Sequence, residues 1–522
     1  MGDALKNGTK RTQGMDALAI NVGLCTDIAD MVSTTLGKHG LDKMLVDSMG
    51  DAVITNDGAT ILSTLDVGQP ASKLLVNIAK TQDEQCGDGT TTATILAGAL
   101  LRECLDVRQK WGIHQTIITR GYSLAMNRCL SKLKELIIPC LSKDDLMNIA
   151  KTSINSKTAK AYDEVLTKIA VEAISMIYDK DTGKADVKNI KIVKKSGGGV
   201  NDSELIKGAI LQNKVPKGAA RSLRVPEVVL ITGSLAITKA DVEAKTWDDM
   251  KEIKSGEHDE LLKLVEKIRG NMAVFVRGKI DERILPELIK RGVMPVENVH
   301  PDDMNLLERV TKARSVDITI LATSDIGKAD SIDVRVVSGE ELLNVISLDS
   351  KAVSVMIRGG AYQSMDEIDR GLHDCLMVVS DAMEDQSMLA GGGSSMEAMA
   401  VDLRDFAKYQ GGKEQLAIEA YADALESIPL TLARNGGMDA LEVLLELRTL
   451  HVEGKWKMGV DYDKMKAGDM VEGKVLEPFR VVRQAIQSAT EVAIQVIRVD
   501  DMLIAKPLTE THPDLATNSI GR

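Results

Sequence analysis

The sequence of 522 residues is poor in aromatic side chains, with 3 Trp, 7 Tyr and 3 Phe, and it has no excess of basic residues. Proteins that bind single-stranded nucleic acid stack bases on aromatic rings, and clustered Lys and Arg hold phosphates. Here 65 Lys plus Arg stand against 77 Asp plus Glu, a net charge of −12. Both shortages argue against nucleic acid as a partner.

Cysteine and long apolar runs are also scarce. The 6 cysteines are scattered without a C-x-x-C pair, so we expect neither a disulfide framework nor a zinc site, but reduced thiols. No apolar run approaches the roughly 18 residues of a membrane span. The N-terminus has no signal-peptide pattern, and Lys6 stands where a myristoylation motif requires Ser or Thr. These absences predict a cytoplasmic protein without membrane contact.

Only 11 prolines are present, and no Pro- or Ser-rich linker divides the chain. At roughly 150 residues a domain, the length favours about three domains, which must be joined by short crossings. Helical periodicity dominates up to about residue 185 and again after Ser364, with a mixed α/β segment between. The predicted strands of that segment are Ile190–Val193, Glu227–Thr232, Ala273–Arg277, Asp317–Leu321 and Val353–Ile357. We therefore expect an inserted α/β domain and a shared domain that holds both termini.

Local patterns near the two ends are more specific. Apolar spacing predicts a helix over Asp16–Leu36, followed by two short strands, Lys43–Asp47 and Ala52–Thr55. The last helix begins at Pro478, a residue suited to a first helical turn, and the tail Val496–Ile504 is strand-like.

One segment carries a recognisable chemistry. Gly87–Thr92 reads Gly-Asp-Gly-Thr-Thr-Thr and opens a helix, whose free N–H groups and dipole favour phosphate, while an Asp in such a loop can hold Mg²⁺. No Gly-Lys-Ser/Thr follows, so it is not a Walker loop. For a lone Gly-Asp-Gly an ordinary helix cap is the more common explanation, and the three threonines and further segments have to decide. Asp57 follows a predicted strand and Asp374 lies on a predicted helix, and each alone is more often a surface acid.

Several segments together resemble a known family. In chain order they are Thr55–Leu62, Gln82–Ala93, Thr152–Lys157, Gly197–Leu205, Asp366–Asp374, Gly391–Gly393, Gly436–Asp439, Glu477–Pro478 and Val496–Asp501. The sequence is similar in these segments to subunits of group II chaperonins, the family of the archaeal thermosome and the eukaryotic cytosolic chaperonin. The likeness extends over nearly the whole chain.

The resemblance implies the chaperonin fold. A mainly α equatorial domain would comprise residues 1–140 and 387–522, and a nested intermediate domain residues 141–208 and 358–386. An inserted α/β apical domain would comprise residues 209–357. It also implies a homo- or hetero-oligomeric double ring with other chaperonin subunits, which encloses non-native protein clients.

The resemblance also assigns residues to the cofactors ATP and Mg²⁺. It implies nucleotide contacts from Leu36, Gly37, Gly89, Thr90, Thr91, Thr92, Ser156, Lys157, Gly392 and Glu477. Asp88 would bind Mg²⁺. Asp57 and Asp374 would be the catalytic carboxylates that orient and deprotonate the attacking water, with Asp374 arriving when the intermediate domain closes. The implied function is an ATPase coupled to protein folding.

Three departures from the family pattern keep alternatives open. Lys38-His39 stand where Pro-Lys is common, Met396 replaces a usual Glu with Glu397 next, and the lid segment around Lys245–Leu261 is short. A ring-forming scaffold or holdase with weakened ATPase is one alternative. A metal-dependent ATP enzyme such as a small-molecule kinase is another, although the sequence has no basic phosphate clamp for it.

Overall fold

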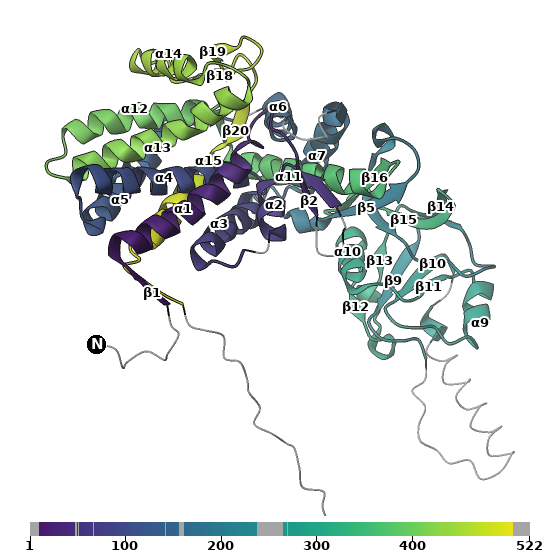
Figure 1. Cartoon of the computed structure of the whole chain (residues 1–522). Helices are drawn as coiled ribbons and strands as arrows, with labels where there is room; N and C mark the ends of the chain where they lie inside the picture. The colour runs from purple at the N-terminus through teal and green to yellow at the C-terminus, as the bar shows by residue number, and fades with distance from the viewer. Residues whose placement is uncertain are drawn as a thin grey trace, which may run out of the picture.

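A computed structural model describes residues 10–46, 50, 52–65, 67–140, 142–155, 161–236, 265–268 and 270–504 of the chain. Long helices gather at one end of the molecule and most strands lie at the other end (Figure 1). A smaller group of helices lies between the two ends (Figure 1).

The helical end is built around one buried helix. Its helices are α1 (Gly14–Ser33), α2 (Gly58–Thr64), α3 (Pro70–Cys86), α4 (Thr90–Trp111), α5 (Gln115–Glu135), α12 (Ser394–Lys408), α13 (Glu414–Asn435), α14 (Ala440–Val452) and α15 (Phe479–Ile497). Helix α4 packs against α1, α3, α13 and α15, and every residue of Ala93–Leu101 is buried. A Cβ atom at Gly98 would lie 2.4 Å from Cβ of Ala29, so glycine allows α1 and α4 this close approach. A helix buried on all sides is typical of a domain core.

Short strands tie distant parts of the chain to this end. They are β1 (Lys10–Gln13), β2 (Lys43–Val46), β3 (Ala52–Thr55), β4 (Ile138–Pro139), β17 (Ser387–Ala390), β18 (Met458–Asp461), β19 (Lys466–Asp469), β20 (Leu476–Pro478) and β21 (Asp501–Ile504). β1 and β21 pair antiparallel, so the two ends of the described chain lie side by side. β17 pairs with β4 and β20, which places three distant segments in one sheet.

The middle group has its own core. It consists of α6 (Lys143–Ile154), α7 (Asp163–Ile177), α11 (Tyr362–Asp385), β5 (Ile190–Ser196), β6 (Glu204–Ile206) and β16 (Val353–Gly359). β16 is the central strand, parallel to β5 and antiparallel to β6. Helix α11 packs against α6, α7 and β16. It also contacts α3 and α15 of the helical end, so it joins the two groups.

The strand-rich end contains two sheets. Its elements are β7 (Gly208–Leu211), β8 (Ser222–Arg224), β9 (Glu227–Ile231), β10 (Met272–Val276), α9 (Leu285–Lys290), β11 (Met294–Val296), α10 (Pro301–Thr311), β12 (Ser315–Val316), β13 (Gly327–Lys328), β14 (Ser331–Val337) and β15 (Glu340–Ile346). One sheet has the parallel order β11-β10-β9-β12, with β13 antiparallel on β9. The other has the antiparallel order β7-β15-β14-β8.

Most of the predicted elements are present, but one predicted strand is wrong. Residues 318–320 of the predicted strand Asp317–Leu321 form a turn of 3₁₀ helix, and the strand β12 ends before them. The carboxylate of Asp317 accepts hydrogen bonds from the backbone N–H of Thr319 (2.9 Å) and from its hydroxyl (2.7 Å). An aspartate that caps the next residues in this way competes with extended backbone, so the β-branched pattern was misleading.

Two boundaries also differ from the predictions. Pro478 is the N-cap residue of α15 and not part of its first turn, and α15 continues to Ile497, so residues 496 and 497 of the predicted strand are helical. The three threonines after Gly89 form the first turn of α4 and not a loop.

Helix α12 buries an acid without compensation. The side chain of Glu397 is 0% exposed, and neither of its carboxylate oxygens has a hydrogen-bond partner among the described residues. Burial, and then the nearby carboxylate of Glu426, raise the pKa of Glu397 to about 8. Arg404 and Arg448 oppose this shift, but both form ion pairs with Glu426 and not with Glu397. An uncompensated buried polar group costs stability.

We therefore expect Glu397→Met to raise the stability of the protein by about 1–3 kcal/mol. A carboxyl whose pKa is higher in the folded than in the unfolded state destabilises the fold progressively as pH rises between the two values. The gain should therefore grow from pH 5 to pH 8. This gain in stability is measured from the thermal unfolding midpoints of wild type and Glu397→Met at pH 5 and pH 8. Glu397→Gln is the uncharged polar control. A gain that is the same at both pH values would contradict the account.

Candidate functional site

The loop between α3 and α4 is the starting point of the candidate site. Gly87 (φ 67°) is the C-cap residue of α3 and Gly89 (φ 80°) is the N-cap residue of α4, so both glycines take the left-handed backbone that other residues avoid. Gln82 donates from Nε2 to the carbonyl oxygens of Asp88 (2.9 Å) and Val481 (3.2 Å), which fixes the loop against α15. Asp88 accepts from the N–H of Gly89 at Oδ1 (2.7 Å).

A cavity of about 520 Å³ opens beside this loop. Its wall comes from the loop, from α6 and α11 of the middle group, and from α12, α13, α15 and β18–β20. The sequence-predicted residues in the wall are Leu36, Gly37, Asp88, Gly89, Thr92, Gly392 and Glu477. Segments more than 400 residues apart in the chain therefore meet at one hollow.

A conformational reason supports glycine at one of these positions. Gly392 has φ 62°, and a Cβ atom there would lie 2.5 Å from Sδ of Met470 and 3.2 Å from the carbonyl oxygen of Val460. Both Met470 and Val460 also line the cavity. A side chain at position 392 would therefore distort the wall.

Asp57 lies beside the first turn of α4 but is not part of the described cavity wall. As the N-cap residue of α2, it accepts from the backbone N–H of Thr60 (2.7 Å) and of Ala59 (3.4 Å). Its Oδ1 also accepts from the hydroxyl of Thr90 (3.3 Å). The carboxylate is thus held at the helix end where a phosphate would bind. Thr90 and Thr91 are buried next to Gly58 and are not in the described wall either.

Asp374 lies on α11, on the other side of the same loop. Its side chain is buried (6% exposed) and is also outside the described wall, whereas Val378, one turn later, lines the cavity. A Cβ atom at Gly87 would lie 2.4 Å from Cβ of Met377 and 3.8 Å from Cα of Asp374. Helix α11 therefore rests directly on the loop, and the two predicted catalytic carboxylates adjoin its two ends.

Glu477 has an unusual electrostatic environment. It accepts a hydrogen bond from the hydroxyl of Ser395 (3.1 Å). Burial first, and the negative charge of Asp88 in addition, raise the pKa of Glu477 to about 7, although the hydrogen bond opposes the shift. Asp88 and Glu477 therefore face the same cavity as an acidic pair that a cation would stabilise.

Several residues in or beside the wall were not predicted as site residues from the sequence. Lys38 pairs with Asp463 (2.6 Å) and His39 lies edge-on to the ring of Tyr462 (5.0 Å between centroids), so the unusual Lys38-His39 turn contacts the β18–β19 segment. Ser153 on α6 is buried in the wall, and its hydroxyl has no hydrogen-bond partner among the described residues. The motif around Thr152 contained this serine, but no sequence signal shows which of its hydroxyls faces the hollow.

Two predicted nucleotide contacts, Ser156 and Lys157, lie outside the described residues, as does the lid segment. The structure therefore gives no position for them.

The residues present fit a nucleotide with Mg²⁺. The N-terminus of α4 points its free N–H groups at the loop, since Gly89 provides no side-chain cap. The two lysines of the described wall each pair with an aspartate, Lys38 with Asp463 and Lys464 with Asp461 (3.2 Å), and no arginine is among the wall residues. Asp88, Glu472 and Glu477 remain as acids. A polyphosphate would be repelled there unless a divalent cation accompanied it.

The cysteines do not supply a reactive thiol to this site. All 6 cysteines are free and buried, and burial raises the pKa of the thiol of Cys86, the residue before the loop, to about 12. A buried thiol that stays protonated is inert. Within the described residues, no helix combines the length and the apolar character that a membrane crossing requires.

Comparison with known proteins gives one family. Residues 28–507 match the model of the TCP-1/cpn60 chaperonin family. A thermosome subunit of Pyrococcus horikoshii is 40% identical over 517 residues, which cover 97% of this chain and 94% of the relative. Two subunits of Archaeoglobus fulgidus are similar, thermosome subunit beta at 40% over 518 residues and thermosome subunit alpha at 39% over 517, each covering 97% of this chain and 95% of the relative. The chain therefore belongs to the TCP-1/cpn60 chaperonin family, and within it to the group II chaperonins.

Proposed function

We propose that this chaperonin subunit hydrolyses ATP and uses the energy to enclose non-native proteins in a double ring of such subunits. The observation that carries the proposal is the cavity beside the Gly87–Gly89 loop, because its wall joins the helical end to α6 and α11 of the middle group. A ligand bound there touches both groups. Its binding and hydrolysis can therefore change how the two groups sit together.

The proposed contacts follow from the wall. Leu36, Gly37, Gly89, Thr92, Gly392 and Glu477 would contact the nucleotide, with Thr90 and Thr91 supplying the N–H groups of the α4 terminus. Asp88 would hold Mg²⁺, which when bound neutralises phosphate charge. Ser156 and Lys157 are proposed contacts as well, on the resemblance alone.

The two carboxylates would act on the attacking water. Asp57, held by Thr60 and Thr90, would orient the water from the helical end. Asp374, which lies on α11, would accept the proton of this water. Because these residues come from different groups, both are in place only when α11 rests on the loop, and hydrolysis would be gated by closure.

The three groups of elements correspond in this proposal to the three chaperonin domains. The helical end would be the equatorial domain (1–140 and 387–522), the middle group the intermediate domain (141–208 and 358–386), and the strand-rich end the apical domain (209–357). The partners would be other chaperonin subunits, as the alpha and beta names of the thermosome relatives indicate, and non-native proteins.

Steady-state ATP hydrolysis by the purified full chain tests the proposal. We expect Mg²⁺-dependent hydrolysis that Asp57→Ala lowers by on the order of 10²-fold or more, the usual share of a positioned carboxylate. Asp439→Ala is a matched control, because Asp439 is likewise an N-cap residue that accepts from two backbone N–H groups, on α14. Each substitution removes an N-cap side chain, which lowers the stability of the fold by about 1 kcal/mol.

The control should keep wild-type turnover. Equal losses in the two variants would mean that Asp57 only caps α2. Absence of hydrolysis by the wild type would favour the scaffold or holdase and overturn the proposal.

A further inference from the structure

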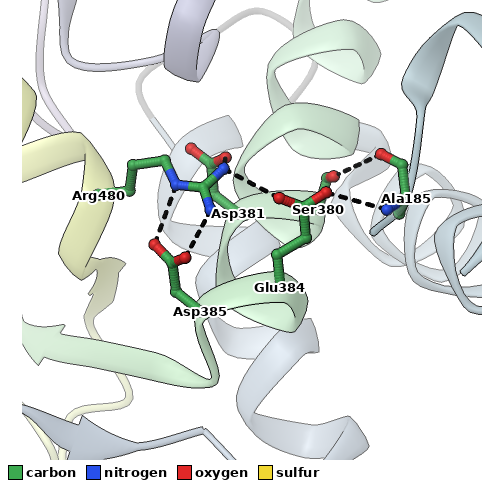
Figure 2. Close-up of polar contacts among 6 residues, drawn as sticks. All are labelled: Ala185, Ser380, Asp381, Glu384, Asp385 and Arg480. Carbon is green, nitrogen blue, oxygen red and sulfur yellow. Dashed lines mark hydrogen bonds and ion pairs between the residues drawn. The ribbon is translucent and has the colours of Figure 1, made fainter. Parts of the chain in front are cut away.

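One arginine joins the end of α11 to the start of α15. Arg480, in the first turn of α15, donates from Nε to Oδ2 of Asp385 (2.9 Å), and from Nη1 to Oδ1 of Asp381 (2.8 Å) and Oε2 of Glu384 (3.1 Å). A second bond to Asp385 makes that pair bidentate. Figure 2 shows the guanidinium between the three carboxylates, which we call the Arg480 cluster. Bidentate pairs fix orientation as well as distance.

The cluster is also anchored in the middle group. Glu384 accepts from the backbone N–H of Ala185 (2.9 Å) with its other oxygen, and Ser380 donates to the carbonyl oxygen of Ala185 (3.0 Å) (Figure 2). Arg480 is therefore linked through Glu384 of α11 to Ala185, which lies in the segment before β5. This network joins the C-terminal end of α11 both to α15 of the helical end and to Ala185 beside β5 of the middle group.

Asp381 of the cluster shares a helix face with Asp374, the proposed proton acceptor. Asp374, Val378 and Asp381 follow one another at spacings of four and three residues, which places them on one face of α11. Asp374 is buried, Val378 lines the cavity, and Asp381 bonds Arg480. Seven residues of helix span about 10 Å. A helix is rigid over this distance, so fixing its end also fixes where Asp374 lies.

The contact between α11 and α15 depends on the charge of Arg480. Three carboxylates share one guanidinium, and Asp381 is 3% exposed with no hydrogen-bond partner on Oδ2 among the described residues. Burial raises the pKa of Asp381 to about 7, while Arg480 opposes the shift. Without Arg480, three acids would repel one another beside the site.

We propose that Arg480 is a positioning residue for ATP hydrolysis: it holds the C-terminal end of α11 on α15 so that Asp374 meets the nucleotide loop. The inference rests on the proposed function, because it needs Asp374 to act on the water. It adds a residue that does not line the cavity and contacts no proposed ligand. Its loss should therefore slow the chemical step without weakening nucleotide binding.

The test compares Arg480→Met, Arg480→Lys and wild type in the full chain. We measure kcat for ATP hydrolysis and, by titration calorimetry, the Kd of Mg-ADP. Displacing a reacting group by about 1 Å costs up to roughly 10²-fold in rate, so Arg480→Met should lower kcat by about 10- to 100-fold at unchanged Kd. Arg480→Lys keeps the charge but loses the planar fork, and its kcat should lie between the other two.

Arg128→Met is the matched control. Arg128 forms a bidentate pair with Asp402 (2.7 Å to each oxygen) between α5 and α12, away from the Arg480 cluster in the chain. This variant should keep wild-type kcat. If Arg480→Met does not fold, Arg480→Lys and Asp385→Asn carry the test, and both should lower kcat at unchanged Kd.

The outcomes separate the two claims. The positioning role would be overturned if Arg480→Met kept the wild-type kcat, or if Arg128→Met lost as much kcat. It would also be overturned if the Kd of Arg480→Met for Mg-ADP weakened in proportion to its loss of kcat. If Asp374→Asn abolishes hydrolysis in the same assay while Arg480→Met keeps the wild-type kcat, only this inference fails. If Asp374→Asn itself keeps wild-type turnover, the proposed function fails with it.

Discussion

Asp374→Asn is expected to lower the turnover of ATP by on the order of 10²- to 10⁴-fold, the range that a positioned general base contributes. The substitution keeps the shape of the side chain but removes the group that accepts the proton of the attacking water. Asp374 does not belong to the described cavity wall, so the affinity for Mg-ADP should stay that of the wild type. Single-turnover hydrolysis and calorimetry measure the two effects separately.

Asp366→Asn is a suitable control for this prediction. Asp366 lies on the same helix and pairs with Lys194 at 2.7 Å, on the exposed part of α11. Because such an exposed pair is worth little, the control should keep its turnover. Wild-type turnover in Asp374→Asn would show that another group accepts the proton, and the account of α11 would be wrong.

Gly87→Ala should also lower the turnover of ATP, although Gly87 supplies no side chain to the site. The left-handed backbone (φ 67°) makes any side chain costly, by about 1–2 kcal/mol. The added methyl would also lie 2.4 Å from Cβ of Met377. Because the Cβ atom cannot rotate away, α11 itself has to move from the loop. We expect turnover to fall by about 10- to 100-fold as Asp374 is displaced.

Gly112→Ala separates strain from displacement. Gly112 ends α4 with nearly the same backbone angle (φ 62°), but a Cβ atom there would have nothing within 4 Å. Both variants should lose a similar amount of stability from backbone strain, measured by thermal unfolding. Only Gly87→Ala should lose turnover. If Gly87→Ala hydrolyses ATP at the rate of the control, α11 does not need its contact with the loop.

Local patterns predicted the elements well where one interaction dominates. The helix starting near Asp16 is present because its apolar spacing matches the burial of one face. The strands near Lys43 and Ala52 are present as an antiparallel pair, although the apolar side chains of Met44, Val46, Val53 and Ile54 are exposed. The strand predicted at Asp317 failed because a single carboxylate bonds the backbone two residues later. Periodicity does not register such a local cap.

The site could be predicted only as separate motifs. The loop at Gly87–Gly89 was visible because glycines and an aspartate at a helix start suit a phosphate and Mg²⁺, although only the other motifs distinguished it from an ordinary helix cap. That Lys38 would pair with Asp463, or that Ser153 would face the cavity, depends on contacts between distant segments that no local signal encodes. The same holds for Arg480, whose acidic partners lie about 95 residues earlier in the chain.

The central claim is that nucleotide bound beside the Gly87–Gly89 loop drives closure of a double ring. Electron microscopy of the purified full chain, without nucleotide and with Mg-ATP, tests it most directly. The account predicts double rings in both conditions, with the apical ends drawn together only when ATP is present. A monomer, or rings that look the same with and without ATP, would contradict it.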